Sequence, residues 1–230
     1  MKFEKDDIDR LRDRWGDPLL TALTGLLVVM LFVVAPLQAA GLFAFQVFEL
    51  VLAIVLVVGV FILSGSGLGA VAMVGALAMI ATGAILRLRS PSILDLNLFA
   101  GSWLIMGIVL GWVVIRATFA PGRVTYHRVI GAVLLYPTVA IIFASLFTFI
   151  GSLIPNAFAG LTVEDSPALA SRVIYFSFSM LTTTGYGDIA PVHPVARSLC
   201  NLEAIFGQLY PATLLARLVT LELAHREPSE

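Results

Sequence analysis

A run of threonines, glycines and one tyrosine, TTTGYGD over residues 182–188, has the residue types and the spacing to do chemistry with its backbone. Gly185 and Gly187 stand one residue apart, and glycine adopts left-handed backbone conformations without steric cost. A loop with left-handed residues at alternate positions turns successive carbonyl oxygens toward one side. A row of such oxygens can replace the hydration shell of a cation. The run therefore predicts a loop that presents a row of main-chain oxygens.

This loop resembles the selectivity filter of the potassium channel family, which reads TVGYG. The resemblance implies that five residues bind K⁺ through their carbonyls: Thr183, Thr184, Gly185, Tyr186 and Gly187. It also implies that Thr183 adds a hydroxyl at the inner end of the row and that Tyr186 points away from the ion. The match continues from Asp188 to Pro191, a stretch similar to the family's GYGDxxP ending.

The residues before the loop predict a helix. Asp165 is a favourable N-cap and Pro167 falls in the first turn, which together open a helix of about 14 residues ending at Leu181. By resemblance this is the pore helix, whose partial negative C-terminal charge faces the ion and favours cations. Glu164 and Asp165 precede it, where fourfold repetition would raise the cation concentration at the outer mouth. A solvated loop is the alternative for these two acids.

Six residues are expected to support the filter from behind: Thr182, Asp188, Tyr175, Phe176, Ser179 and Glu203. The family's equivalent of Asp188 hydrogen-bonds an aromatic side chain of the pore helix. By alignment that partner is Tyr175, with Phe176 beside it. Thr184 replaces the family's central valine, so its hydroxyl needs a partner when it is buried. We expect Ser179 or an ordered water to supply that partner and selectivity to survive the replacement.

The segment after the loop resembles the inner helix of the family. Gly207 resembles the family's hinge glycine and Pro211 follows within a turn, so a kink is expected here. The same alignment points Gln208 into the cavity below the filter. It places Leu215 and Val219 lower down, as candidates for a hydrophobic constriction that gates by dewetting.

Glu203 is an acid at bilayer depth, where an unpaired charge is costly. We expect it to be neutral or paired. If it faces the back of the pore helix, it supports the filter and replaces the acid that some members of the family carry at the position of Ser179. If it faces the cavity, it attracts cations and blockers instead.

Composition predicts an integral membrane protein. The chain is 59% hydrophobic and 13% charged, with a mean hydropathy of +0.98. Apolar segments near or above the roughly 20 residues that cross a bilayer recur along it. The predicted spans are residues 18–40, 44–64, 67–87, 94–117, 127–154 and 193–222. The first is too long, and the residues before it too mixed in charge, for a cleavable signal peptide.

Orientation follows from charge. With six spans, a filter that faces outside requires both termini to be cytoplasmic, and this places ten of the 14 Lys and Arg residues inside. Arg87 and Arg89 are exceptions at the outer end of the third span, close in depth to Glu49 and Asp95. We expect ion pairing among these four residues; a gating or sensing site is the alternative.

The first four spans show no recognisable ligand chemistry. The fourth contains no basic residue from Leu96 to Ile115, so it is not an arginine-rich voltage sensor. At the start of the chain, Ile8, Leu11 and Trp15 fall on one face and predict an interfacial helix along the inner leaflet. A solvated tail is the alternative.

The expected fold class is an all-α integral membrane protein, with an interfacial helix and four spans in residues 1–120 and a pore domain in residues 121–230. Because one loop cannot surround an ion, four chains are expected to form a homotetramer in the lipid bilayer. The expected function is passive, K⁺-selective conduction without any cofactor beyond permeant K⁺, without a nucleic acid partner and without enzymatic activity. A weakly selective cation channel and a non-conducting membrane sensor or partner subunit are the alternatives.

Overall fold

The computed structural model describes residues 21–41, 67–89, 92–119, 126–164, 166 and 168–226, and helices dominate these residues. The α-helices are α2 (Ala35–Ala39), α4 (Gly67–Arg89), α5 (Ile93–Phe119), α6 (Tyr126–Leu153), α7 (Leu169–Leu181) and α8 (Pro194–Arg226). Residues 21–29 are also α-helical and continue through a π-helical turn, η1 (Met30–Val34), into α2. Two short strands, β1 (Phe158–Ala159) and β2 (Ala190–Pro191), pair antiparallel.

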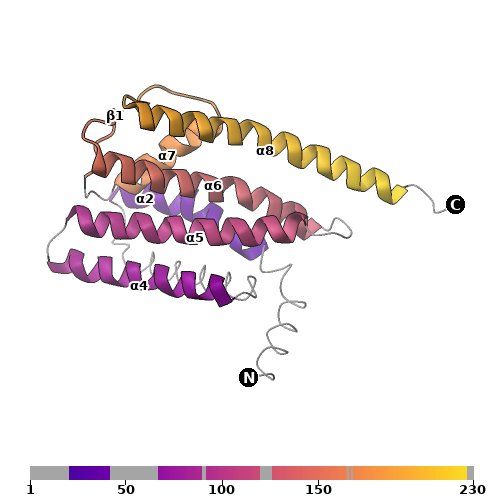
Figure 1. Ribbon diagram of the computed structural model, residues 1–230, viewed down its shortest axis with the longest axis horizontal. Helices are drawn as coiled ribbons and strands as arrows, with labels where there is room; N and C mark the ends of the chain where they lie inside the picture. Colours follow the sequence, from indigo (N-terminus) through magenta and orange to yellow (C-terminus); the bar gives the residue numbers. More distant parts are fainter. Residues whose placement is uncertain are drawn as a thin grey trace, which may run out of the picture.

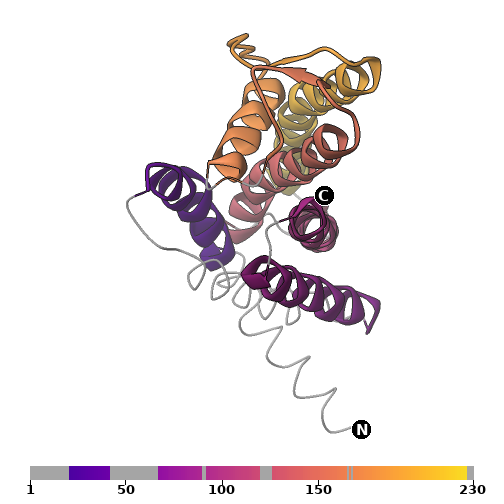
Figure 2. The same cartoon turned by 90° about the vertical axis from the view of Figure 1, so that its left-hand side faces the viewer.

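The long helices α4, α5, α6 and α8 run roughly lengthwise through the molecule (Figure 1). α5 packs against both α4 and α6, and the shorter α7 lies against α6 and α8 at one end. The end-on view shows the helical segment 21–39 beside α7 (Figure 2). There Phe32 of η1 contacts Phe178 of α7, with ring centroids 5.1 Å apart. The first apolar segment therefore touches α7 directly, a contact that sequence reasoning did not predict.

Hydroxyl groups inside the apolar helices are satisfied locally. In α6, Thr138, Ser145 and Thr148 each donate to the carbonyl four residues earlier, at 2.8 to 2.9 Å. An unsatisfied polar group is costly in apolar surroundings. Bonding back to its own helix lets each of these side chains be buried without a partner from another element.

Glycines allow α5 to approach both of its neighbours closely. A Cβ atom at Gly101 would lie 2.6 Å from Met79 Cε of α4. A Cβ at Gly107 would lie 2.8 Å from Ile142 Cγ1 of α6. Small residues at helix contacts are the usual means of close packing in membranes, where lipid is as apolar as the side chains.

An aromatic cluster joins α6, β1 and α7 at one end of the molecule. Phe147, Phe158 and Phe176 lie with ring centroids 4.9 to 5.7 Å apart, in tilted or edge-to-face geometry. All three rings are buried. Such contacts add to the area that is buried, so the cluster anchors the start of the segment that leads to α7.

Three of the described helices are long and apolar enough to cross a membrane: Leu68–Arg87, Ile93–Arg116 and Val129–Leu153. They agree within a few residues with the predicted spans 67–87, 94–117 and 127–154. The described part of the predicted first span is a shorter apolar helix, Thr21–Leu37. The span 44–64, the interfacial helix and the boundary at residue 120 lie outside the described residues. α8 matches the predicted last span in extent but carries more polar residues, so six spans stay a prediction.

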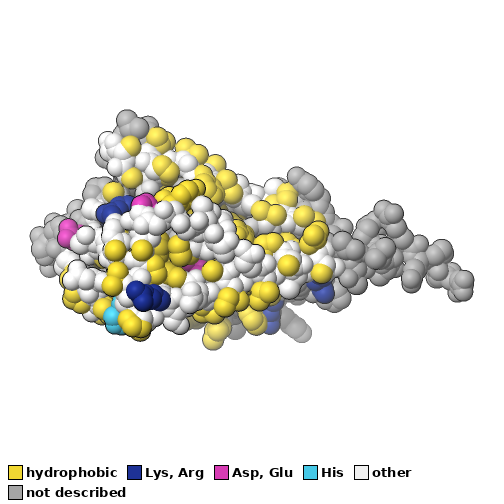
Figure 3. Space-filling model, turned by 90° about the horizontal axis from the view of Figure 1, so that it is seen from above, with side chains coloured by type: hydrophobic (Ala, Val, Ile, Leu, Met, Phe, Trp, Pro, Cys, Tyr) yellow, Lys and Arg dark blue, Asp and Glu magenta, His cyan; other side chains and the backbone are white. Residues whose placement is uncertain are grey.

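Apolar side chains cover much of the face that includes α8 (Figure 3). Large exposed residues on α8 include Leu202, Ile205 and Leu209, each more than half exposed in the single chain. The most exposed apolar residue of α4 is Leu68, followed by Val71. Exposed apolar surface on this scale marks contact with lipid or with other protein chains.

Candidate functional site

The helix that leads to the candidate site has the predicted end, Leu181, and 13 residues where about 14 were predicted. α7 starts at Leu169 after the N-cap Ala168, which makes no side-chain cap hydrogen bond. The N–H of Leu169 instead donates to the carbonyl of Ser166 at 3.1 Å. This backbone turn precedes the first residue of the helix, and the predicted Asp165 cap stays a prediction. Asp165 and Pro167 themselves lie outside the described residues.

The loop after α7, residues 182–188, is called the glycine loop here, and its N–H groups are bonded back to α7. Thr183 donates to the Met180 carbonyl at 2.9 Å. Thr184 and Gly185 both donate to the Ser179 carbonyl, at 2.9 and 3.2 Å. Tyr186 donates to the Ser179 hydroxyl oxygen at 3.4 Å. These bonds satisfy the last carbonyls of the helix and hold the loop close to its end.

The backbone of the glycine loop alternates in handedness. Thr183, Gly185 and Gly187 have φ of 57°, 58° and 85°, whereas Thr184 and Tyr186 between them are not left-handed. Sequence reasoning anticipated the two glycines but not Thr183. Threonine is β-branched and disfavours this region, so its neighbours must hold it there. Its N–H bond to Met180 and the bond from Gln208 Nε2 to its Oγ1, at 2.8 Å, do so.

The carbonyl oxygens of the glycine loop stay free. Within the described part of the chain, those of residues 183–187 accept no hydrogen bond, and all seven residues of the loop are exposed in the single chain. The C-terminal end of α7 lies beside them and contributes partial negative charge. The arrangement can therefore hold a cation through oxygens that accept no hydrogen bond from the described residues.

The hydroxyl of Thr184 has a different partner from the one predicted. Its Oγ1 lies 2.8 Å from Thr182 Oγ1, which itself donates to the Phe178 carbonyl at 2.7 Å. Ser179 is instead buried beneath the loop, where its carbonyl and hydroxyl serve the loop N–H groups. The prediction of a Ser179 partner is wrong because the left-handed turn at Thr183 brings the two flanking threonines together on the exposed side.

The acid at the end of the loop makes the expected contact. Tyr175 Oη donates to Asp188 Oδ1 at 3.1 Å. Tyr175 also stacks on Tyr186, with ring centroids 5.7 Å apart and planes 14° apart. Phe176 packs instead into the aromatic cluster described above. The two aromatic neighbours on α7 thus join that helix to two different parts of the structure.

The chain beyond Asp188 is clamped by the segment between α6 and α7. Strands β1 and β2 pair Phe158 with Pro191 and Ala159 with Ala190. Gly160, with φ of 75°, passes so close that a Cβ there would lie 1.9 Å from the Asp188 carbonyl oxygen. The guanidinium of Arg172 donates to the Gly160 carbonyl. Sequence reasoning missed this clamp, because no local pattern marks two-residue strands.

Two residues of α8, one helical turn apart, lie against α7. Glu203 is 0% exposed, and its Oε1 contacts the hydroxyl of Ser177, so it lies behind the predicted pore helix rather than facing an open cavity. At Gly207 a Cβ would lie 1.8 Å from the Leu181 carbonyl oxygen. The same carbonyl accepts a hydrogen bond from Tyr136 Oη at 3.1 Å. Gly207 was predicted as a hinge, and the structure adds a packing role at the start of the loop.

The other predicted inner-helix residues are spread along α8. The helix continues through Gly207 and Pro211 to Arg226. Gln208 reaches Thr183 as described, and Leu215 is exposed. The side chain of Val219 lies outside the described residues. Glu164 is exposed and precedes α7, as a solvated or outer-mouth acid would be.

Asp95, predicted to join an ionic cluster, caps its own helix. Its Oδ1 accepts hydrogen bonds from the N–H and the hydroxyl of Ser92, the latter at 2.7 Å. This reciprocal arrangement is a capping box at the start of α5. A Ser three residues before an acid is the signal that would have found it. Glu49 and the side chain of Arg89 lie outside the described residues, so the ionic cluster stays a prediction.

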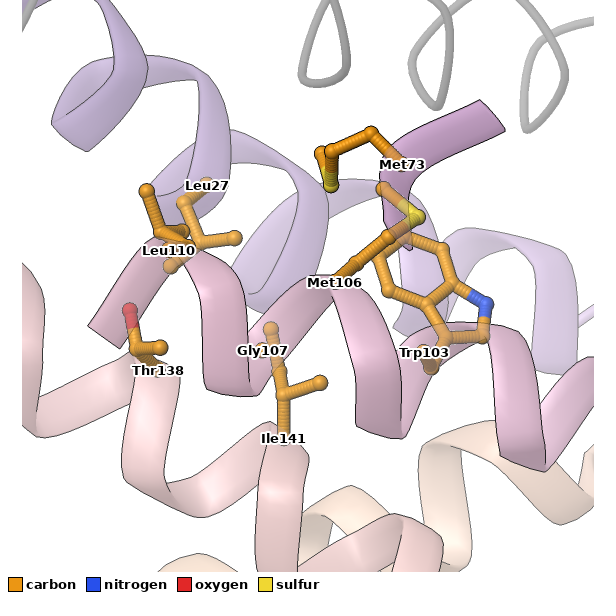
Figure 4. A pocket seen from close by; sticks show the side chains of 8 residues that line it. All are labelled: Leu27, Met73, Trp103, Met106, Gly107, Leu110, Thr138 and Ile141. Carbon is orange, nitrogen blue, oxygen red and sulfur yellow. The ribbon is translucent and has the colours of Figure 1, made fainter. Parts of the chain in front are cut away.

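A small cavity lies away from the glycine loop, among the 21–29 helix, α4, α5 and α6 (Figure 4). Leu27, Met73, Trp103 and Met106 line it together with residues of α6. Its volume of about 10 Å³ is no more than one water molecule needs, and its lining is apolar. It is a packing gap of the membrane helices and not a ligand site.

Comparison with known proteins points to the same part of the chain. A family model described as ion channel matches residues 135–222, which include most of α6, all of α7, the glycine loop and most of α8. No curated protein and no solved structure matches the chain. The match supports an ion channel function, and together with the apolar helices it indicates a membrane protein.

Proposed function

We propose that the protein is a potassium-selective channel that conducts K⁺ passively through the glycine loop. The proposal rests on the difference between the N–H groups and the carbonyl groups of that loop. The N–H groups of residues 183–186 are bonded to α7, while the carbonyls of residues 183–187 accept no bond from the described residues. Alternating handedness turns those carbonyls toward one side, where a dehydrated K⁺ can replace water by oxygen.

The active form is a homotetramer in a lipid bilayer. A single loop presents carbonyls from one direction only, whereas a selective site needs oxygens around the whole ion. The exposed loop and the exposed apolar residues of α8 are the surfaces that such an assembly would cover. Four copies place four Thr183 hydroxyls, each bonded to a Gln208 amide, at the inner end of the row.

Flux from liposomes that contain the full chain tests the proposal. K⁺, Rb⁺ and Na⁺ gradients are compared for the wild type and for Gly185→Ala. A Cβ meets nothing within 4 Å at Gly185, so the substitution acts only through the left-handed backbone, with φ of 58°. The left-handed region costs a non-glycine residue about 1 kcal/mol or more. Gly75→Ala is the matched control, because its Cβ also meets nothing within 4 Å but Gly75 lies inside helix α4.

We expect K⁺ and Rb⁺ flux without Na⁺ flux in the wild type and in Gly75→Ala, and its loss in Gly185→Ala. Equal Na⁺ flux would favour the weakly selective cation channel. Reconstituted protein without any flux would contradict passive conduction under the conditions of the assay. Cross-linking of the purified protein counts the chains, and any number other than four overturns the tetramer.

A further inference from the structure

The carboxyl group of Glu203 is buried and has no positively charged partner among the described residues. Glu203 is 0% exposed near the middle of α8. Its Oε1 contacts the Ser177 hydroxyl, and its Oε2 has no hydrogen-bond partner. Among the described residues no Lys, Arg or His pairs with it. A carboxylate buried in this way carries a large desolvation cost.

The hydrogen atoms around Ser177 decide which form of the carboxyl fits. The Ser177 hydroxyl also lies 2.8 Å from the Ala140 carbonyl oxygen of α6. A hydroxyl has one hydrogen to donate, and a carbonyl can only accept. If the Ser177 hydrogen goes to Ala140, the contact with Glu203 requires a hydrogen from the carboxyl. If it goes to Glu203, Ser177 and Ala140 face each other as two oxygens without a hydrogen between them.

Asp95, another buried acid of the chain, has a different set of neighbours, although its Oδ2, like Oε2 of Glu203, has no hydrogen-bond partner among the described residues. Both groups that contact its Oδ1, the N–H and the hydroxyl of Ser92, can donate. Asp95 also lies at the positive N-terminal end of a helix, which favours a negative charge. Glu203 has neither feature, since it lies in the interior of α8 and its one partner has another acceptor to satisfy.

The titratable groups near Glu203 do not compensate a negative charge either. From α6 the nearby group is Tyr136, whose hydroxyl hydrogen is directed at the Leu181 carbonyl. On α8 it is Cys200, a buried free thiol one turn earlier. From α7 the facing group is Ser177 itself. An ionised Glu203 would face groups that are neutral or themselves anionic when deprotonated.

We propose that Glu203 is a protonated, neutral carboxyl that donates to Ser177, and that this proton links α8 to α7 and, through Ser177, to Ala140 of α6. Glu203 is thus a positioning residue for the end of α7 that carries the glycine loop. One turn further along α8, Gly207 touches the Leu181 carbonyl, so the two contacts hold the same side of α7. The effect on conduction rests on the proposed channel function, whereas the protonation itself does not.

Loss of the Glu203 proton is expected to weaken the contact between α8 and α7. At low and neutral pH the carboxyl donates and the link is complete. As pH rises through the titration of the group, the hydrogen is lost and a buried charge replaces it. The link between α8 and α7 then weakens, and flux falls with rising pH and recovers when the pH is lowered.

Infrared spectroscopy of the full chain in liposomes tests the protonation without reference to conduction. We expect a carbonyl band of a protonated carboxylic acid that shifts on exchange into deuterated water and is absent from Glu203→Gln. The band should persist in Asp95→Asn, the matched control for a buried acid. In Ser177→Ala it should persist at a higher frequency, because the acid has lost its acceptor. Absence of the band from the wild type, or its loss in Asp95→Asn alone, overturns the proposal.

Flux as a function of pH tests the link. Wild-type K⁺ flux should fall at least severalfold as pH rises to alkaline values. Glu203→Gln, whose amide donates at every pH, should show a flat profile over the same range. Glu203→Ala should lose flux at all pH values because it has no donor. Equal pH profiles for the wild type and Glu203→Gln overturn the positioning role. A wild type with the infrared band but no flux overturns the channel function and leaves the protonation standing.

Discussion

The apolar helices α4 and α5 and the segment from α6 to α8, here called the pore segment because of the proposed function, differ in how far their polar side chains reach. In α4 and α5, Thr82 and Ser102 donate to carbonyls of their own helices. Hydroxyls of α6 also bond within their own helix. From α6 to α8, however, Tyr136 reaches Leu181, and Tyr210 reaches the Ala132 carbonyl at 2.6 Å, each from one helix to another. The described part of α5 takes part in one such bond, from Ser152 of α6 to Asn97 Oδ1 at 2.8 Å. The first region is held mainly by the shapes of packed side chains. The second is positioned by directed bonds, which accept only one register between helices.

This difference matches what each region must do. Apolar helices that pack by shape tolerate small shifts, because a side chain can change its rotamer. A row of carbonyls that replaces the hydration shell of an ion does not tolerate such shifts. The same substitution should therefore cost more in the pore segment than in α4 or α5, and the predictions below test that ranking.

The largest effect is expected from Gly207→Ala. Its Cβ would collide with a backbone carbonyl, 1.8 Å away, so α7 or α8 must move. Overpacking of this kind costs typically about 1 to 3 kcal/mol, and more where backbone must shift. We expect lower thermal stability in detergent and loss of K⁺ flux. Gly107→Ala, whose Cβ meets the Ile142 side chain at 2.8 Å, is the matched variant in the other region and should cost less. A larger loss in Gly107→Ala would reverse the ranking.

Tyr136→Phe is expected to have an intermediate effect. It removes the hydrogen bond to the Leu181 carbonyl without changing the volume of the side chain. A single bond of this kind contributes about 0.5 to 1.5 kcal/mol. We expect a lower melting temperature and a change in flux, because Leu181 begins the turn into the glycine loop. Unchanged stability together with unchanged flux would show that α6 does not position the loop through this bond.

A smaller effect is expected from Thr184→Val. Among the described residues, the Thr184 hydroxyl has one partner, Thr182 Oγ1, which keeps its bond to the Phe178 carbonyl in the variant. Both groups are exposed in the single chain, so the change should cost less than about 0.5 kcal/mol. K⁺ over Na⁺ selectivity in liposome flux should stay as in the wild type. Loss of selectivity would assign the threonine pair a role in ion binding.

The smallest effect is expected from Ser102→Ala in α5. Its hydroxyl donates to the Phe99 carbonyl of the same helix, at 2.7 Å, and links no second element. Removing this hydroxyl leaves the contacts between helices in place, so the free energy of unfolding should change less than in Tyr136→Phe. Thermal unfolding of Ser102→Ala and of Tyr136→Phe, measured under the same conditions, compares the loss of stability in the two variants. Equal losses in the two variants would remove the distinction between the two regions.

A further test concerns a contact between the first apolar segment, which belongs to neither region, and α7. Phe32 of the first apolar segment packs on Phe178 of α7, and Phe32 is more than half exposed. Phe32→Leu keeps an apolar side chain and removes the ring contact, which is worth about 0.5 to 1.5 kcal/mol beyond buried area. A change in K⁺ flux without a change in folding would show that the first segment acts on the pore helix.

Local rules explain what was predicted correctly. Hydropathy located α4, α5 and α6 to within a few residues because the length of an apolar segment is a property of the sequence alone. The predicted helix of about 14 residues ending at Leu181 agrees with the 13 residues of α7, since helix ends are defined only to within one or two residues.

The sequence by itself determined the glycine positions of the loop, the apolar helices and the order of short helix, loop and long helix (α7, glycine loop, α8), since each depends on residues close together in the chain. Only the tertiary structure decided that Thr183 is left-handed, that Thr182 rather than Ser179 bonds Thr184, and that Gly207 touches Leu181. It also decided that Glu203 meets Ser177, 26 residues away in the chain. These features depend on distances between separate helices, which packing sets and no local pattern encodes.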